Sequence, residues 1–194
     1  MNKFIKWLYL SIFCKPRFLN LVGHLGKKSF IREHRIIREG KYISIGNNTT
    51  IGSYSRIVCI DEMGGAKYTP CLKIGDNVSI SMHFTAFCSG SLIVENNVLI
   101  AANVLITDLN HGIDPESKLD YGDQQYSVKD VKIGQGTWIG QNSVILPGVT
   151  IGKKCVIGAS SVVTKNIPDY CIAVGNPAKE IKKYNFKTQR WEKI

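Results

Sequence analysis

Aliphatic side chains recur every six residues along most of this chain. From residue 133 onward they occupy consecutive positions of the repeat, namely Ile133, Ile139, Ile145, Ile151, Ile157 and Val163. The same spacing occurs upstream at Ile45, Ile51 and Ile57, at Ile74 and Ile80, and at Val94, Ile100 and Ile106. A period of six fits neither the 3.6-residue turn of an α-helix nor the two-residue alternation of an ordinary strand.

This period predicts short parallel strands joined by tight turns. Two or three extended residues are followed by a turn in which Gly or Asn can adopt positive φ. Three such units close a triangular coil of about eighteen residues, and coils stacked about 4.8 Å apart form parallel sheets around one core. We therefore expect an all-β fold, a hexapeptide-repeat parallel β-helix solenoid. Cys155 is at the fifth, inward position of its hexad, which favours a small core residue over a reactive thiol.

The repeat divides the chain into three regions. Residues 1–39 lack it and are predicted to form a basic, partly helical N-terminal cap over the open first coil. One helical face is marked by Phe4, Trp7, Leu8 and Ile12, and a second helix is expected from about Arg17 to Leu25, ending near Gly26. Residues 40–178 form the predicted β-helix domain, and residues 179–194 form a basic tail that closes the other end as a helix or an extended segment.

Two stretches interrupt the hexads within the β-helix domain. The first, residues 61–71, is rich in Gly and contains a Pro, and the second covers residues 107–130. Because long loops in a compact domain are usually functional, residues 107–130 are the candidate catalytic loop.

The charge of the chain is concentrated at its ends. The 194 residues are 44% hydrophobic and 21% charged, an ordinary globular composition, but the formal net charge is +10. Residues 1–39 hold nine basic and two acidic side chains, residues 40–178 hold ten and eleven, and residues 179–194 hold six and two. Basic ends on a neutral body argue against nucleic-acid binding and favour anionic lipid, a charged glycan or a polyphosphate cofactor.

The cysteines and the N-terminus indicate a cytoplasmic protein. The six cysteines show no C-x-x-C and no spacing typical of a metal site, so we predict reduced thiols and no bound metal. The apolar run Trp7 to Cys14 is far shorter than the roughly 20 residues that a membrane-spanning helix requires. It is followed by Lys15, Pro16 and Arg17 rather than by a small-residue cleavage site.

Three motifs in a fixed order carry a resemblance to a known family. They are the loop TDLNHGIDP at 107–115, the segment GTWIG at 136–140 and the segment GNPAK at 175–179. Together with the hexads, they make residues 30–183 resemble the hexapeptide-repeat acyltransferases. Within these, the chain is similar to the galactoside/maltose acetyltransferase group and to the O-acetyltransferases of bacterial O-antigen and capsule assembly. The resemblance implies a left-handed β-helix, acetyl-CoA as the donor and a homotrimer with active sites between subunits.

The resemblance also implies a general base and an acceptor site. Acetyl transfer to a sugar hydroxyl needs a group that removes the hydroxyl proton, and His111 is the candidate because its unperturbed pKa lies near neutrality. Asp108 or Asn110 could orient the imidazole or bind an acceptor hydroxyl. The asparagine that positions the acceptor in the galactoside group falls near Ser81, but this chain has Ile-Ser-Met-His there. Ser81 or His83 contacting the sugar is therefore a hypothesis, with a place in the coil wall as its alternative.

The expected donor site follows the C-terminal coils. The resemblance puts Trp138 and Gln141 near the pantetheine arm, Ala159 at backbone contacts, and Thr164 with Lys165 near the nucleotide. Lys179 and Lys182 match basic positions that meet the 3′-phosphate, consistent with the attraction of ammonium groups for a multiply charged anion.

The sequence thus predicts an acetyl-CoA-dependent O-acetyltransferase that acts on a sugar of a surface polysaccharide or its lipid-linked precursor. Peripheral contact of the basic N-terminus with an anionic membrane is a further hypothesis. An N-acetyltransferase of a nucleotide-linked amino sugar, an antibiotic acetyltransferase of streptogramin type and a non-catalytic hexapeptide scaffold remain as alternatives. A γ-class carbonic anhydrase is set aside because it needs three His ligands and only His83 and His111 lie in the predicted repeat region.

Overall fold

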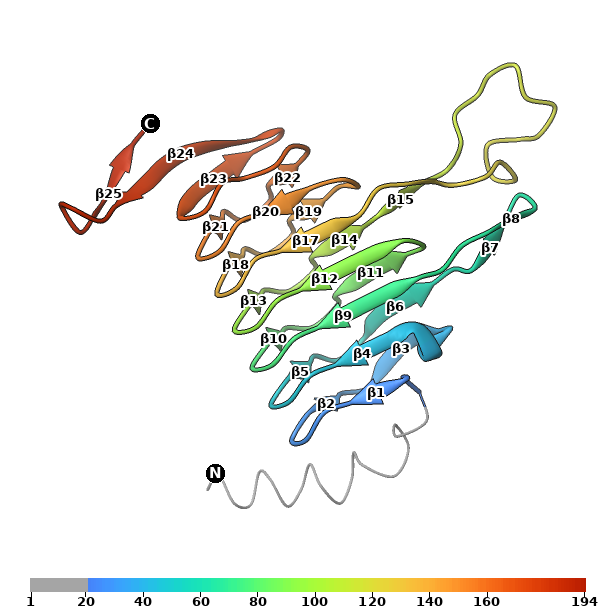
Figure 1. Cartoon of the computed structure of the whole chain (residues 1–194), viewed down its shortest axis with the longest axis horizontal. Helices are drawn as coiled ribbons and strands as arrows, with labels where there is room; N and C mark the ends of the chain where they lie inside the picture. Colours follow the sequence, from blue (N-terminus) through green and yellow to red (C-terminus); the bar gives the residue numbers. More distant parts are fainter. Residues whose placement is uncertain (1–20) are drawn as a thin grey trace.

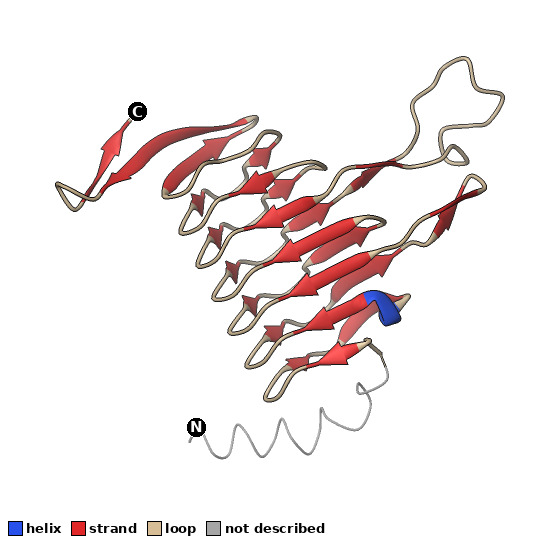
Figure 2. Cartoon of the chain, viewed as in Figure 1, coloured by secondary structure: helices blue, strands red, loops and turns tan. Residues whose placement is uncertain are grey.

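The computed structural model describes residues 21–194, so the first predicted helix lies outside the described residues. Short parallel strands form three sheets around a triangular core, with a single turn of 3₁₀-helix, η1 (Gly40–Tyr42), on the described part of the chain (Figures 1 and 2). Each coil of the chain passes through the first, second and third sheet in turn. No helix within residues 21–194 has the length and apolar character needed to span a membrane.

The strands of the three sheets are short, and most have two to five residues. The first sheet contains β1 (His24–Leu25), β4 (Ile43–Ile45), β9 (Cys71–Ile74), β12 (Ser91–Val94), β17 (Val131–Ile133) and β20 (Thr150–Ile151). The second contains β2 (Phe30–Ile31), β5 (Thr50–Ile51), β10 (Ser79–Ile80), β13 (Leu99–Ile100), β18 (Trp138–Ile139), β21 (Val156–Ile157), β23 (Cys171–Gly175), β24 (Ala178–Asn185) and β25 (Arg190–Lys193). The third contains β3 (His34–Arg38), β6 (Ser55–Cys59), β11 (Thr85–Cys88), β14 (Leu105–Thr107), β19 (Val144–Ile145) and β22 (Val162–Val163).

The sheets meet at three corners. We call the turns between the first and second sheets the first corner, those between the second and third sheets the second corner, and those between the third and first sheets the third corner. The third corner is therefore the vertex opposite the second sheet.

The core is built from the residues that the period singles out. In the second sheet, equivalent isoleucines pair from coil to coil in parallel register, in the order Ile51, Ile80, Ile100, Ile139 and Ile157. All of them are buried, as are the fifth-position residues Thr137, Ser143, Val149, Cys155, Ser161 and Ile167. The solenoid prediction is confirmed, and Cys155 is a core residue. Removing these columns of aliphatic side chains from water is the main favourable contribution to folding.

Many of the turns at the corners follow the expected chemistry, and several carry other residue types. Asn48, Asn77 and Asn97 at the first corner and Asn142 at the second all have positive φ, as expected for the residue type that best tolerates this conformation after Gly. At the second corner Tyr54, His83 and Ser160 take the same place in their coils, with φ values of 60°, 59° and 57°.

The β-helix begins earlier than the hexads suggested. The prediction of a second helix that ends near Gly26 is wrong in its C-terminal part, because His24–Leu25 is a strand of the first sheet. Strands β2 and β3 complete a first coil before residue 40 and carry Ile31 and Ile37. His24 and His34 therefore lie on a coil as well. At the other end the extended alternative holds, since β24 and β25 add to the second sheet as antiparallel strands.

We call the three-sided stack of coils the prism. Both interruptions of the repeat leave the prism at the third corner. Residues 61–71 form a hairpin with strands β7 (Glu62–Met63) and β8 (Ala66–Lys67), which pair antiparallel. The longer loop starts and ends in a two-stranded antiparallel ladder of β15 (Leu109–Asn110) and β16 (Ser127–Val128). In Figure 1 both project to the right of the prism, whereas β24 and β25 extend to the upper left.

A buried glutamine organises the candidate catalytic loop from inside. Gln124 is only 6% exposed. Its Oε1 accepts the Asp114 N–H at 3.0 Å, and its Nε2 donates to the carbonyl oxygens of Asp114 at 3.0 Å and Leu119 at 3.1 Å. Gly112 packs directly on Gln124, because a Cβ at residue 112 would lie 2.7 Å from the Gln124 Cβ. The segment that follows His111 is thus fixed by one side chain.

Replacing Gln124 by leucine should loosen this loop and leave the prism folded. The substitution removes three hydrogen bonds at similar side-chain volume, each typically worth about 0.5–1.5 kcal/mol. We expect cleavage within residues 107–130 in limited proteolysis to become roughly tenfold faster, since local opening governs cleavage. Mass spectrometry of the fragments measures this. Gln125→Leu, at an exposed neighbouring position, is the control, and equal cleavage of both variants would contradict the assignment.

Candidate active site

His111 stands at the base of the long loop, immediately after β15. Its side chain is exposed, and its imidazole meets the ring of Tyr126 edge to face, with ring centroids 4.9 Å apart and an interplanar angle of 78°. Tyr126 comes from the returning arm of the same loop, just before β16. An imidazole in this position has one side against an aromatic ring and the other open to a substrate.

Tyr126 is in turn held by the first interruption of the repeat. The Tyr126 backbone N–H donates to the Tyr68 hydroxyl oxygen at 2.7 Å, and this hydroxyl donates to the Tyr126 carbonyl at 3.4 Å. The two rings lie 5.9 Å apart. Burial raises the pKa of the Tyr126 phenol, so at neutral pH Tyr126 is an uncharged aromatic neighbour of His111.

Asp108 anchors the loop to the coil below it. Its side chain is fully buried, and its carboxylate oxygens accept the backbone N–H groups of Ser89 at 2.8 Å and Gly90 at 2.9 Å. Burial raises the pKa of Asp108, and the two N–H donors oppose that rise. Both oxygens are therefore engaged with the third corner of the preceding coil. Asn110 is exposed beside His111, in register with Ser127.

Ser81 and His83 lie at a different corner from His111. Both are exposed at the second corner, where the imidazole of His83 stacks on the Tyr54 ring with centroids 5.4 Å apart and planes 22° apart. Met82 between them is half exposed. Within one chain, the structure does not bring these residues to the His111 loop.

The expected donor-site residues gather mainly on the second sheet. Trp138 points outward from β18 and is 49% exposed. Gln141 and Ala159 are exposed at the second corner in successive coils, where the Ser160 N–H donates to the Gln141 carbonyl at 2.8 Å. Lys179 and Lys182 lie on β24, opposite Val174 and Ile172 of β23. Thr164 and Lys165 are exposed after β22 at the third corner.

Within the described chain, His111 and most of the residues expected at the donor site therefore lie on opposite sides of the prism. The His111 loop leaves from the third corner, and the strand series β18, β21, β23 and β24 forms part of the opposite sheet. Their charges also differ in sign: residues 107–130 contain six acidic and two basic side chains, and residues 179–194 contain two acidic and six basic ones.

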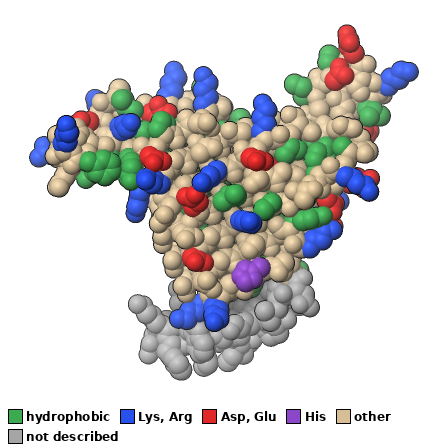
Figure 3. All heavy atoms as spheres, in the orientation of Figure 1, with side chains coloured by type: hydrophobic (Ala, Val, Ile, Leu, Met, Phe, Trp, Pro, Cys, Tyr) green, Lys and Arg blue, Asp and Glu red, His purple; other side chains and the backbone are tan. Residues whose placement is uncertain are grey.

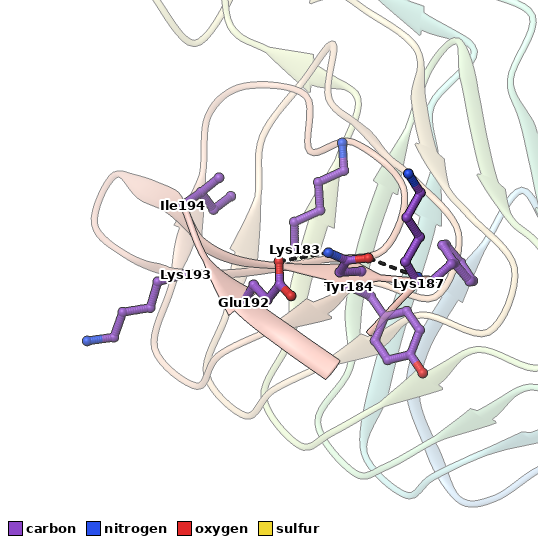
Figure 4. Close-up of a pocket in the computed structure, with 8 residues that line it drawn as sticks. Lys183, Tyr184, Lys187, Glu192, Lys193 and Ile194 are labelled. Atoms are coloured by element: carbon purple, nitrogen blue, oxygen red, sulfur yellow. Dashed lines mark hydrogen bonds between the residues drawn. The ribbon is translucent and has the colours of Figure 1, made fainter. Parts of the chain in front are cut away.

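A hollow lies on the C-terminal hairpin (Figure 4). Lys183, Lys187 and Lys193 line it together with Tyr184 and Phe186. The rings of Tyr170, Phe186, Tyr184 and Trp191 meet edge to face in that order. Figure 3 shows the same part of the molecule as a projection that carries several basic side chains.

Sequence reasoning missed Gln124, Tyr126 and Tyr68. Tyr126 and Gln124 lie within the loop that it singled out, and Tyr68 lies within the other interruption of the repeat. The available signal was the presence of two interruptions at the same corner, two coils apart. The contact itself cannot be seen without the fold.

Comparison with known proteins identifies the family of the repeat. Residues 130–165 match the family described as bacterial transferase hexapeptide (six repeats). The chain is 37% identical over 189 residues to "Putative lipopolysaccharide biosynthesis O-acetyl transferase WbbJ" of Escherichia coli (strain K12), covering 91% of this chain and 93% of that protein.

Two solved structures share the fold. One is the hexapeptide-repeat-containing acetyltransferase VCA0836 of Vibrio cholerae O1 biovar eltor complexed with acetyl coenzyme A, with 26% identity and a TM-score of 0.53 over 95% of this chain and 79% of that one. The other is AntD, an N-acyltransferase from Bacillus cereus, with 23% identity and a TM-score of 0.69 over 86% of this chain and 87% of that one. The three-sheet prism is a left-handed parallel β-helix, and the chain belongs to the hexapeptide-repeat acetyltransferases.

Proposed function

We propose that this chain, an acetyl-CoA-dependent acetyltransferase by its family, transfers acetyl to a sugar hydroxyl of a surface polysaccharide or its lipid-linked precursor in the cytoplasm. The observation that carries the proposal is the exposed imidazole of His111, held on a loop that Gln124 and Tyr126 order. The relative with nearly full-length similarity is described as an O-acetyl transferase of lipopolysaccharide biosynthesis, which favours a hydroxyl acceptor over an amine.

The reaction that these residues support is direct transfer. The acceptor oxygen attacks the thioester carbonyl carbon while His111 removes the hydroxyl proton, an assistance typically worth about 10²–10⁴-fold in rate. The tetrahedral intermediate then collapses, the carbon–sulfur bond breaks, and the imidazolium returns the proton to the coenzyme A sulfur. No acyl-enzyme intermediate is required. Asp108, engaged with the Ser89 and Gly90 N–H groups, supports the loop, and Asn110 is the polar side chain nearest in sequence that can meet an acceptor hydroxyl.

The second sheet suits the proposed donor. From Trp138 on β18 to the lysines of β24 there are three strand steps, or about 15 Å at the usual spacing. An extended pantetheine arm can follow this outward face from Trp138 and Gln141 past Ala159, with Lys179 and Lys182 attracting the phosphates at the far end. Thr164 and Lys165 lie at the third corner of the same coils. In this proposal they contact the nucleotide of a coenzyme A molecule that is bound on the second sheet of a neighbouring chain.

We expect His111→Ala to lower acetyl transfer at least ~100-fold while acetyl-CoA binding is retained, because only the proton acceptor is lost. Free thiol release from acetyl-CoA measures turnover with a panel of sugars, nucleotide-linked amino sugars and extracted polysaccharide. His24→Ala, an exposed histidine on the first coil, is the matched control.

Three results would redirect this proposal. Turnover on amino sugars alone favours the nucleotide-sugar N-acetyltransferase alternative, and unchanged activity of His111→Ala rejects His111 as base. Absence of acetyl-CoA binding to the wild-type protein favours a non-catalytic scaffold.

We further propose that the enzyme is a homotrimer in which the acidic His111 loop of one subunit meets the basic second-sheet face of the next. Two halves on opposite sides of a prism form a complete site only in such a ring. Ser81 and His83 at the second corner then lie beside the neighbour's loop and are candidates for acceptor contact.

Mixed trimers test this arrangement. His111→Ala chains and Lys179→Glu/Lys182→Glu chains should each be inactive alone. When the two are co-refolded in equal amounts, about a quarter of the sites should be active, because random assembly joins an intact loop to an intact donor face with that frequency. Sedimentation equilibrium checks the trimer. Recovery no greater than in unmixed samples would show that each chain holds its whole site.

Finally, we propose that the basic N-terminal end contacts anionic lipid at the inner membrane, where a lipid-linked acceptor is found. Each Lys or Arg near such a surface contributes about 1 kcal/mol. Flotation should show binding to vesicles with phosphatidylglycerol, none to neutral phosphatidylcholine, and loss of binding in high salt.

Lys27→Glu/Lys28→Glu, in an exposed turn of the first coil, should weaken this flotation at least tenfold. The same reversal at Lys187 and Lys193 on the C-terminal hairpin should not. The opposite ranking would assign the contact to the hairpin, and salt-insensitive binding or none would reject the proposal.

A further inference from the structure

The two interruptions of the repeat pack against each other outside the prism. The β7–β8 hairpin reaches the returning arm of the long loop at Gly64, where a Cβ would lie 2.7 Å from both the Asp123 carbonyl oxygen and the Gln125 nitrogen. Gly64 also has a φ of 57°. Both the close approach and the conformation require glycine here, so the hairpin has a built contact with the loop.

Tyr68 supplies the polar half of this contact. Its hydroxyl accepts the Tyr126 N–H at 2.7 Å and donates to the Tyr126 carbonyl at 3.4 Å. One phenol thereby satisfies both backbone groups of a residue 58 positions away. Outside the sheets, backbone N–H and C=O groups need other hydrogen-bond partners of this kind. The hydroxyl consequently fixes the peptide on which the Tyr126 ring is carried.

The base of the hairpin is tied to the second coil. The Asp61 carboxylate accepts a hydrogen bond from the Tyr42 hydroxyl at 3.1 Å and pairs with Lys41 at 3.2 Å. Lys41 also pairs with Glu39. The Lys41 ammonium lowers the pKa of Asp61, which keeps the carboxylate ionised. The Tyr68 N–H donates to the Asp61 carbonyl at 2.8 Å and closes the hairpin. Tyr68 is therefore held at its backbone by the base of the hairpin and at its hydroxyl by Tyr126.

We propose that the β7–β8 hairpin is a positioning element for the catalytic loop, and that Tyr68 is the positioning residue that sets the orientation of His111 through Tyr126. This inference rests on the proposed role of His111. An exposed imidazole loses efficiency when it is free to rotate, and a displacement of about 1 Å can cost about 10²-fold in rate. Tyr68 touches neither donor nor acceptor in this role.

Tyr68→Phe is the sharpest test, because it removes one oxygen and keeps the ring. We expect kcat to fall about tenfold, with the KM for acetyl-CoA within about twofold of the wild-type value and the melting temperature little changed. Tyr121→Phe is the control, since Tyr121 lies on the same loop but is 58% exposed. Gly64→Ala, which pushes the hairpin away from the loop, should act in the same direction as Tyr68→Phe.

A spectroscopic measurement separates this proposal from the proposed function. In protein labelled with ¹³C at histidine Cε1, the His111 resonance carries the ring-current shift of Tyr126, and His111→Gln assigns it. In Tyr68→Phe this resonance should move toward that of exposed His24, whereas Tyr121→Phe should leave it in place. This measurement needs no acceptor. It therefore tests whether Tyr68 orients His111 even if the His111→Ala experiment rejects His111 as the general base.

Two results would overturn the inference. An unchanged His111 resonance in Tyr68→Phe shows that the imidazole does not depend on Tyr68, whatever happens to the rate. A shifted resonance with unchanged kcat in an enzyme that requires His111 shows that the orientation set by Tyr68 does not matter for transfer.

Discussion

The parallel register between coils is the constraint on which the rest of the molecule depends. Ile80 sits on Ile51 and Ile100 on Ile80, and this stacking continues along all three sheets. A shift of one residue anywhere would turn a core face outward, so each coil must begin its strands where the previous coil began them. Extra residues can therefore be accommodated only at corners, where the chain is already turning.

This constraint explains why both interruptions of the repeat lie at a corner. Both interruptions leave from the third corner, at the ends of the second and fourth coils, with the tight turn at Ser89 and Gly90 between them. The loop is anchored on that turn by Asp108, and the hairpin of the second coil reaches Tyr126 through the Tyr68 hydroxyl. The stack of coils sets the distance between the two interruptions, and so decides that they can meet.

The positions that the period singled out are buried, because burial repeats with the hexads. The first coil was missed although Leu25, Ile31 and Ile37 carry the same spacing, because Ile31 and Ile37 are each followed by Arg in place of the glycine that follows many of the later hexad residues. His111 could be predicted from its motif context. Tyr68 could not, because its contact with Tyr126 spans 58 residues and joins two segments that have no period of their own.

The aliphatic core of the prism and the tip of the long loop are separate parts of the structure. Residues 113–123 carry Ile113, Leu119 and Tyr121 with large exposed fractions, and none of the three belongs to the aliphatic core. Substitutions there leave the stacked isoleucines untouched, so the side chains of the loop tip can change at little cost in folding free energy. Gln124, Asp108 and Tyr126 do not share that freedom, because each is committed to a hydrogen bond that holds the loop in place. The loop thus consists of a fixed base that carries His111 and a tip whose side chains can vary. Asp108 ties the base to the coil below and Tyr126 ties it to the hairpin, whereas Gln124 holds the backbone of the tip from inside the loop.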